Sequence, residues 1–373
     1  MIPKFLRRKQ VDVLAPALLL FLTSAVNLQA QTKTNPFKGY EHLFTAPKQY
    51  HAKFTSNPPV IDGDLSDQTW NDVPWTDAFI DIEGGKRQTP RHATKCKMVW
   101  DKDYLYIAAF LDEPHVWGNI NKHDDIIFYD NDFEIFIDPD NDTHNYFEIE
   151  LNALNTSWDL FLAKPYRALG SALFNWEAKG MKTAVKVDGT INNPSDIDKG
   201  WSIEFAIPYQ ALQIGNDVKV PKAGAFWRIN FSRVEWDTDI VNGKYVKRKD
   251  ASGKTLPENN WVWSPQGVIN MHLPERWGYL HFDDEKSAAK KLPAEETLRK
   301  YLWLVYYKQT AHHNKQKRYA NTLQALDMAG SYQLDGKPIN LSLEATANQF
   351  LFHLNYGNKR MSINQEGALK TYN

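Results

Sequence analysis

The chain has 373 residues, of which 42% are hydrophobic, and this length suits one large domain with an appendage or two ordinary domains. Lys and Arg number 44 against 45 Asp and Glu, and the basic residues form no clustered stripe, which argues against nucleic-acid binding. The chain is rich in aromatic residues, with 13 Trp, 17 Tyr and 19 Phe, and such flat amphipathic rings stack on sugar rings as well as filling a core.

The N-terminus has the form of a secretory signal peptide. Basic residues precede an apolar run from Val13 to Leu22, and a small-residue stretch ends at Ala30. Pro16 interrupts the run, which is too short for a stable bilayer anchor, so we expect removal of residues 1–30 and no membrane span afterwards. Because the lone Cys96 cannot form an internal disulfide, we expect a periplasmic or secreted bacterial protein that is stabilised by core burial.

The first strands are expected after a polar leader at residues 31–48, which shows little periodicity. Residues 50–54 and 58–65 are strand candidates, and a turn ends the second. Residues 66–70 predict a short helical turn that the side chains of Ser66 and Asp67 can cap. A β-hairpin follows at residues 91–111, where an Asp-Lys-Asp turn precedes a continuous apolar run.

The next two strands are expected to carry carboxylates on matching polar faces. Residues 132–138 and 144–152 both alternate between apolar and polar side chains. The polar faces comprise Asp132, Glu134, Phe136 and Asp138 on one strand and Tyr146, Glu148, Glu150 and Asn152 on the other. A buried carboxylate costs on the order of several kcal/mol unless it is hydrogen-bonded, so Glu134 needs protein donors or a polar ligand.

The turn after the first of these strands offers oxygen ligands. Asp138, Asp140 and Asp142 alternate, as calcium sites prefer. The loop lacks the glycine and the distal glutamate of a full calcium loop, which favours a solvated turn over a structural Ca²⁺ site. We therefore expect no cofactor, with Ca²⁺ at these three residues as the alternative.

Further short strands are expected at residues 157–163, 181–187, 201–207, 225–236 and 279–282. Many short strands without long helices between them predict an all-β fold, an antiparallel, jelly-roll-like β-sandwich over residues 49–283.

The rest of the chain has a different pattern. Leu298, Leu302 and Val305 fall at helical spacing and predict a C-terminal α-helical segment at residues 284–329. Residues 330–373 return to strand-like segments and form a small β-rich extension.

Five phrases in order resemble a family 9 carbohydrate-binding module. They are Val60 to Gly63 followed by Trp70, Val99 to Asp101 with Tyr104 to Ile107, Asp132 to Asp138, Gly200 to Pro208, and Pro274 to Gly278. The resemblance covers about residues 50–283 and extends to the exported family-9-like proteins.

The resemblance implies a sandwich of two antiparallel sheets that binds sugars, often alongside xylanases and other glycoside hydrolases, with structural calcium in some members. It places the first aromatic of a sugar clamp at Phe128 and Tyr129. The second position falls at Met271 and His272, where the family pattern has Trp, so we expect a ligand unlike the terminal glucose of well-clamped members. The family's sugar-binding glutamate matches Glu134.

Trp117, Trp263 and Arg233 complete the candidate carbohydrate-binding residues. Aromatic side chains also pack in cores and at rims, so each Trp has a structural alternative. Arg233 is suited to a sugar hydroxyl and also to an ion pair with Glu204 or Glu235.

Three classes of function follow. We favour an exported protein that binds a plant or microbial oligo- or polysaccharide and serves carbohydrate catabolism alongside glycoside hydrolases. The second class is a glycoside hydrolase that uses Glu134 with Glu148 or Glu150, because adjacent strands can hold two carboxylates about 5 Å apart. The third is an envelope structural protein that docks a partner through residues 285–373, with the apolar helical stripe facing the partner instead of the sandwich.

Overall fold

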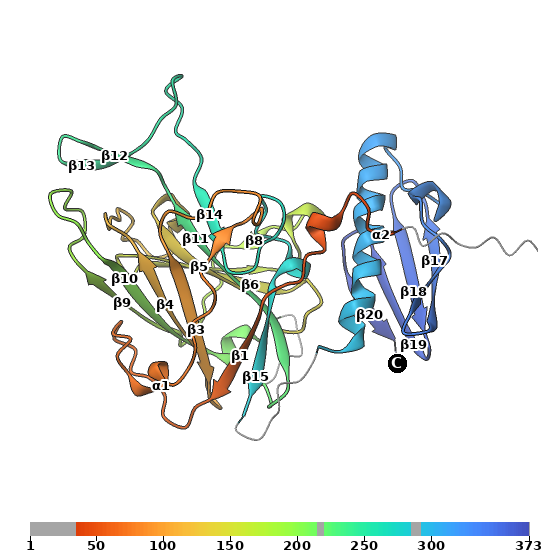
Figure 1. Ribbon diagram of the computed structural model, residues 1–373, viewed down its shortest axis with the longest axis horizontal. Coiled ribbons are helices and arrows are strands. Elements are labelled where there is room, and N and C mark those ends of the chain that lie inside the picture. Colours follow the sequence, from red (N-terminus) through yellow and green to blue (C-terminus); the bar gives the residue numbers. More distant parts are fainter. Residues whose placement is uncertain (1–34, 215–219, 285–291, 373) are drawn as a thin grey trace, which may run out of the picture. The chain divides into compact units, whose positions relative to one another are not determined.

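The computed structural model describes residues 35–214, 220–284 and 292–372 (Figure 1). The signal peptide expected at residues 1–30 lies outside the described residues. Within the described ranges, no helix is both long and apolar enough to cross a membrane.

A curled sheet of 13 strands forms the large β-domain of the described chain. Its strands are β1 Gln49–Phe54, β2 Ile80–Asp81, β3 Thr94–Trp100, β4 Tyr104–Asp112, β5 Asp132–Asp138, β6 Tyr146–Asn152, β7 Ser157–Leu162, β8 Ala172–Leu173, β9 Lys182–Asp188, β10 Gly200–Pro208, β11 Phe226–Glu235, β14 Asn259–Val262 and β15 Gly278–Asp283. The hydrogen-bonded order is β8-β7-β6-β5-β11-β15-β1-β3-β4-β10-β9; off this path, β14 pairs with β11, and β2 pairs with β14. The predicted sandwich-like all-β class is confirmed, although β1 runs parallel to both of its neighbours.

The curl of this sheet encloses the main hydrophobic core. Phe133, Ile135 and Ile137 of β5 point into the core, as the alternation predicts. They share it with side chains of β3, β4 and β10 from the other half of the sheet, among them Met98 and Ile203. The carboxylate face of β5 therefore points away from this core.

Residues 58–65 form no strand, which corrects the prediction for this stretch. Two prolines in the range lack the N–H group that a strand ladder requires. The N–H groups of Asp62 and Gly63 instead donate to Glu204 Oε2, at 2.9 and 2.7 Å. A buried carboxylate on β10 thus takes the place of a neighbouring strand.

The predicted helical turn forms as α1, Gln68–Asn71, but without the expected side-chain cap. Asp67 occupies the N-cap position, and its Oδ2 accepts the N–H of Val60 at 2.8 Å instead of capping the helix. Trp70 is fully buried and donates its Nε1–H to Glu204 Oε1 at 2.6 Å. This buried bond, together with the packing of the indole, holds the short helix in place.

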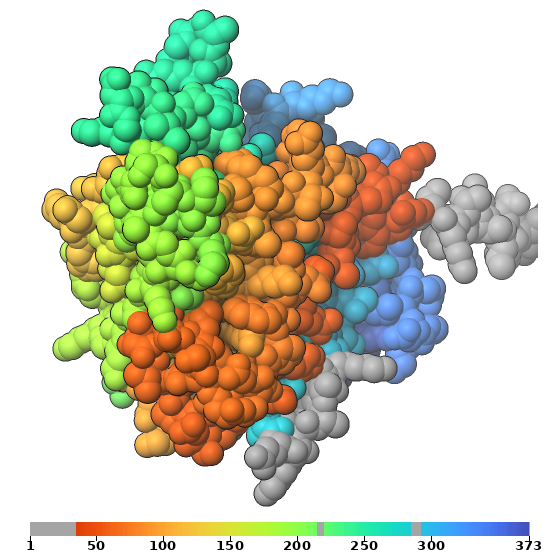
Figure 2. Space-filling model, turned by 60° about the vertical axis from the view of Figure 1, so that its left-hand side comes forward, coloured from red at the N-terminus to blue at the C-terminus, as the bar shows by residue number. Residues whose placement is uncertain are grey.

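A separate hairpin, β12 Thr238–Val241 and β13 Lys244–Lys247, projects from the β-domain (Figures 1 and 2). Its residues show no alternation strong enough to predict a hairpin.

The C-terminal sheet is an antiparallel meander with the long helix α2, Ala294–Gln316, packed on it. Its strands are β16 Ser331–Leu334, β17 Lys337–Ala345, β18 Phe350–Tyr356, β19 Lys359–Asn364 and β20 Leu369–Tyr372.

The apolar stripe of α2 is covered by the chain's own C-terminal sheet. Leu298, Leu302 and Val305 are completely buried in a cluster with Phe352 and Ile363. The sequence left two choices for this stripe, the sandwich or a partner protein, and the structure shows neither. A five-stranded sheet with one apolar face needs a cover, and α2 supplies it.

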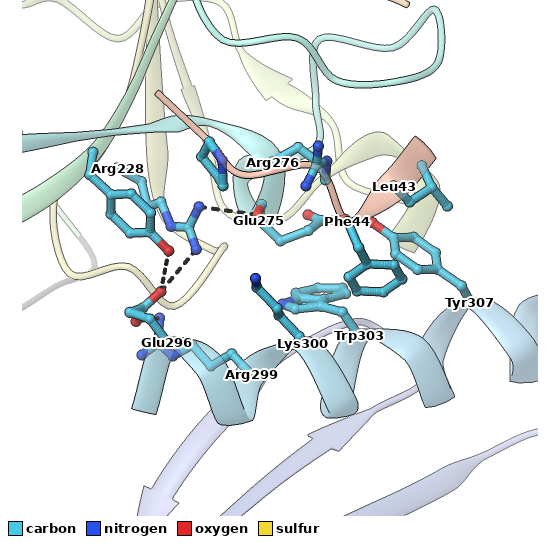
Figure 3. A pocket seen from close by; sticks show the side chains of 12 residues that line it. Leu43, Phe44, Arg228, Glu275, Arg276, Glu296, Arg299, Lys300, Trp303 and Tyr307 are labelled. Atoms are coloured by element: carbon cyan, nitrogen blue, oxygen red, sulfur yellow. Dashed lines mark hydrogen bonds and ion pairs between the residues drawn. The ribbon is translucent and has the colours of Figure 1, made fainter. Parts of the chain in front are cut away.

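The opposite side of α2 meets the β-domain through paired buried charges (Figure 3). Glu296 Oε2 accepts hydrogen bonds from Arg228 at 2.9 Å and from the Tyr279 hydroxyl at 2.6 Å. Glu275 in turn accepts from the Tyr307 hydroxyl at 2.6 Å. Because Arg228 is buried, its charge depends on Glu296 for compensation.

Residues 37–44, which lie within the predicted polar leader, also pack on α2. The rings of Phe37 and Tyr301 lie 5.4 Å apart, and those of Phe44 and Tyr307 lie 5.9 Å apart. The spacing of these aromatic residues is irregular, so the sequence does not predict that they pack on a helix.

We expect Glu296→Ala to lower the free energy of unfolding by about 3–5 kcal/mol, because it leaves Arg228 buried without its partner. Urea denaturation followed by tryptophan fluorescence measures this loss. The matched control is Glu295→Ala on the same helix, since Glu295 pairs with Lys359 at a more exposed position and contributes about 0–1 kcal/mol. Equal losses in the two variants would contradict the assigned role of Glu296.

Candidate functional site

A cavity of about 240 Å³ opens on the polar face of β5 and β6, and we call it the carboxylate pocket. Four glutamates line it: Glu134, Glu148, Glu150 and Glu258. Apolar and aromatic side chains form much of the remaining wall, including Phe128, Phe136, Trp158, Tyr166 and Met271. Asn260 and His272 add polar groups at its edge.

The strand register brings like charges together at the centre of the pocket. Glu134 on β5 lies directly opposite Glu150 on β6. Carboxylate oxygens of Asp132, Glu134 and Glu150 all lie within 4.8 Å of one another. Like charges at directly opposed positions destabilise a sheet, so this arrangement opposes folding unless something else compensates it.

Several buried polar atoms of the pocket lack a hydrogen-bond partner among the described residues. They include Oε2 of Glu134 and Oε2 of Glu148, and both side chains are 5% exposed. The Nε1–H donor of Trp158 is also without an acceptor in this part of the chain. Buried polar groups in folded proteins are almost always paired, so these acceptors and this donor are available to a ligand.

Burial controls the protonation of the pocket carboxyls. It raises the pKa of Glu134 to about 7, and the charge of Glu258 adds to this shift, whereas the Ser232 hydroxyl works in the opposite direction. Burial likewise raises the pKa of Glu148 and of Glu150 well above the ordinary value, and neighbouring carboxylates reinforce the effect. Glu134, Glu148 and Glu150 therefore gain protons more readily than exposed glutamates do.

No Lys or Arg belongs to the pocket lining within the described ranges. His272 is uncharged at neutral pH, because burial and the nearby Arg167 lower its pKa to about 4. Arg167 is engaged by Glu275 at 2.8 Å. Lys247 lies over the Trp236 ring, with its Nζ 3.4 Å from the ring centroid.

The structure brings four of the eight predicted sugar-binding residues to the carboxylate pocket: Phe128, Glu134, Met271 and His272. It also brings Glu148 and Glu150 there, the partners named in the hydrolase alternative. Tyr129 is 51% exposed and contacts Phe128, with 4.8 Å between ring centroids, but does not line the cavity.

Arg233 lies in the interior, away from the pocket, and forms the ion pair that was its structural alternative. Its Nε donates to Glu235 Oε2 at 3.0 Å, and its guanidinium also pairs with Glu113. Val234, the next residue on β11, faces the pocket, so the alternation of the strand turns Arg233 to the other side.

Trp263 and Trp117 are also buried outside the pocket. Trp263 packs in the main core against Gly278, where an added Cβ would lie 2.3 Å from the indole ring. Trp117 is 4% exposed and clusters with Val234 and Trp236. Both side chains therefore serve packing.

Sequence reasoning missed Trp158, Tyr166, Glu258 and Asn260. Trp158 had a usable signal, because it lies on a predicted strand and pairs with Glu150 across the β6–β7 ladder. Following the polar face of β6 across to the next strand, β7, identifies Trp158 as the neighbour of Glu150. Tyr166 and Glu258 lie on chain connections that carry no local pattern, and Asn260 lies on the short strand β14, which the sequence did not predict.

The predicted metal residues form a cluster at the end of β5. Carboxylate oxygens of Asp138, Asp140 and Asp142 lie within 4.8 Å of one another. Burial and the charge of Asp142 raise the pKa of Asp140 to about 6. Asp138 accepts the N–H groups of Asn141 and Thr143, both at 2.9 Å, so internal hydrogen bonds also stabilise the turn. Buried Asn141 Oδ1 has no partner in the described chain, and this donor set fits a hard cation.

Comparison with known proteins assigns the family. Residues 61–264 match the model of the carbohydrate family 9 binding domain-like family. The chain belongs to this family. The matched span contains β2 to β14, and with them every glutamate of the carboxylate pocket.

Two curated relatives are similar to this family 9 chain. One is the exoglucanase XynX of Acetivibrio thermocellus, 24% identical over 308 residues, which cover 75% of this chain and 25% of the relative. The other is the endo-1,4-beta-xylanase A of Thermoanaerobacterium saccharolyticum, 28% identical over 306 residues, which cover 75% of this chain and 24% of the relative. The chain thus spans about a quarter of the length of these relatives.

Two solved structures are also similar. A family 9 carbohydrate-binding module from Caldicellulosiruptor kristjanssonii in complex with cellotriose aligns with a TM-score of 0.42 and 18% identity, covering 66% of this chain and 100% of that one. A putative carbohydrate-binding protein from Bacteroides uniformis aligns with a TM-score of 0.48 and 16% identity, covering 64% of this chain and 100% of that one.

We expect the stability of Glu134→Gln relative to wild type to rise with pH. The folded-state pKa of Glu134, about 7, exceeds its unfolded value. The contribution of this carboxyl to the free energy of unfolding of the wild type is therefore fully present below about pH 4.5 and is lost as the pH rises through 7. Glutamine does not ionise, so the variant should gain on the order of 1–3 kcal/mol relative to wild type between pH 4.5 and pH 8.

Urea denaturation at several pH values measures this difference. The exposed Glu344→Gln on β17 is the control and should show no comparable pH dependence. A Glu134→Gln difference that stays constant with pH would show that the carboxyl is not desolvated.

Proposed function

We propose that the carboxylate pocket binds a sugar unit of an oligo- or polysaccharide. The observation that carries this proposal is the combination, in one cavity, of aromatic walls with buried polar atoms that lack partners. Membership of a carbohydrate-binding family supports it.

The wall of the pocket suits the apolar face of a sugar ring. Trp158 and Phe174 stack in parallel, with centroids 5.7 Å apart and planes 7° apart. Phe174 is 58% exposed, so this stack continues from the pocket to the surface. Stacked aromatic faces of this kind provide flat contact area at a low cost in conformational entropy.

The polar atoms suit sugar hydroxyls. A hydroxyl donates one hydrogen bond and accepts others, so it can satisfy a carboxylate oxygen and an indole N–H together. The open oxygens of Glu134 and Glu148 are the acceptors, and Trp158 Nε1–H is the donor. A bound sugar would thereby remove the cost of leaving these groups unpaired.

The wider role that we propose is glycan catabolism outside the cytoplasm. The signal-like residues 1–30 support export. The names of the two curated relatives, an exoglucanase and a xylanase, support a place beside polysaccharide-degrading enzymes.

Glycoside hydrolysis is the second candidate, and one observation favours it. Glu134 and Glu150 have oxygens within 4.8 Å, near the spacing of about 5 Å in retaining glycosidases. Both carboxyls also have raised pKa values, as a general acid requires. Release of reducing sugar from a bound polysaccharide, lost in Glu150→Gln, would assign this activity.

We expect a glycan panel, read by calorimetry with product analysis, to show binding that Trp158→Ala weakens at least about tenfold, because the stacking face and the indole donor are both lost. Trp158→Phe retains a ring and should lose less. Trp75→Ala is the control, since Trp75 is 39% exposed and contacts Lys97 away from the pocket. Failure of every glycan to bind, or equal losses in Trp158→Ala and Trp75→Ala, would overturn the proposal.

We also propose that Asp138, Asp140 and Asp142 hold a structural Ca²⁺. Millimolar CaCl₂ should then raise the melting temperature of the wild type by about 2–4 °C through preferential binding to the folded state. Asp140→Asn should abolish this increase, whereas Asp335→Asn in the exposed β16–β17 turn should retain it. An unchanged melting temperature in the wild type would identify the loop as a solvated turn.

A further inference from the structure

The charge balance of the carboxylate pocket is the feature that a neutral sugar leaves unexplained. Glu134, Glu148, Glu150 and Glu258 line it, and among the described residues no Lys or Arg does. Burial and the nearby Arg167 lower the pKa of His272, the other basic side chain of the lining, to about 4, so it is uncharged at neutral pH. Burial and neighbouring carboxylates raise the pKa of Glu148 and Glu150, and burial raises that of Glu134; a cation placed among them would favour their ionised forms. The cavity is therefore biased toward positive ligands.

The geometry points to a sugar with a free, protonated amine as the preferred ligand, and this inference rests on the proposed sugar-binding function. An ammonium group donates three hydrogen bonds and carries the charge that buried carboxylates require. Its natural position is between the opposed Glu134 and Glu150, near the open oxygen of Glu148.

The cations near the pocket do not already fill this role. Arg167 donates to Glu275 and to the carbonyl oxygen of His272, so its guanidinium is directed outside the cavity. Lys247 lies over the rings of Trp236 and Tyr129 and is attracted by the charges of Asp130 and Glu258. It therefore compensates Glu258 at most, and Glu134, Glu148 and Glu150 have no Lys or Arg partner among the described side chains.

The lining favours an amino sugar over a bare metal ion. A divalent cation such as Ca²⁺ seeks six to eight oxygen ligands, whereas much of this wall is aromatic or aliphatic. The Trp158 Nε1–H group has no acceptor among the described residues, and it cannot ligate a metal but can donate to a sugar hydroxyl. Aromatic faces also attract ammonium groups by the cation–π interaction.

The test compares sugars that differ only at the amine. Calorimetry on the full chain at pH 7 should show glucosamine and its oligosaccharides binding at least about tenfold more tightly than glucose, N-acetylglucosamine and the N-acetylated oligosaccharides of equal length. Glu134→Gln and Glu148→Gln should each remove most of this preference, and added salt should reduce it. Glu344→Gln, on the C-terminal sheet, should retain it.

Each contrary outcome has a distinct meaning. Neutral sugars that bind as tightly as amino sugars would overturn the amine inference and leave the sugar-binding function intact. Binding of no sugar would overturn both. CaCl₂ titrations that show a metal site dependent on Glu134, with sugar binding lost after chelation, would overturn the inference in favour of metal-mediated binding.

Discussion

The opposed pair Glu134 and Glu150 is the constraint around which the rest of the site is built. Two carboxylates on adjacent strands of a buried sheet face raise the free energy of the folded state, and the chain offers them no cation among the described residues. The opposite face of the same strands is packed with Phe133, Ile135 and Ile149, whose burial offsets that cost. The stable core thus allows the chain to keep an energetically unfavourable group of carboxylates in the pocket. Unfavourable arrangements of this kind are typical of binding sites.

Much of the β-domain could be predicted because alternation is a local property of a strand. It located β5 and β6, divided their faces correctly and identified Glu134 as a costly carboxylate. The same reasoning could not show on which side of β11 Arg233 lies, because this strand is covered on both faces and alternation does not show which side holds the pocket. The place of Trp263 in the main core could not be predicted either, since its ring packs against the distant Gly278.

In the C-terminal part the helix was predicted correctly, but the surface that covers its apolar stripe was not. The helical spacing of Leu298, Leu302 and Val305 predicted an amphipathic helix, and the helix exists. Which surface covers the stripe depends on the sheet that follows it in the chain, a long-range contact that spacing cannot reveal. The charged side of α2, with Glu296, then joins the helix to the β-domain through Arg228.

The position of β1 and β15 in the sheet affects where this protein can be cut. Both strands lie outside the family match at 61–264, yet they sit side by side in the middle of the strand order, between β11 and β3. A fragment trimmed to the matched residues would lose these two strands, split the sheet and expose the main core. It would also lack Met271 and His272 from the pocket wall. The shortest fragment that keeps the sheet continuous therefore begins before Gln49 and ends after Asp283.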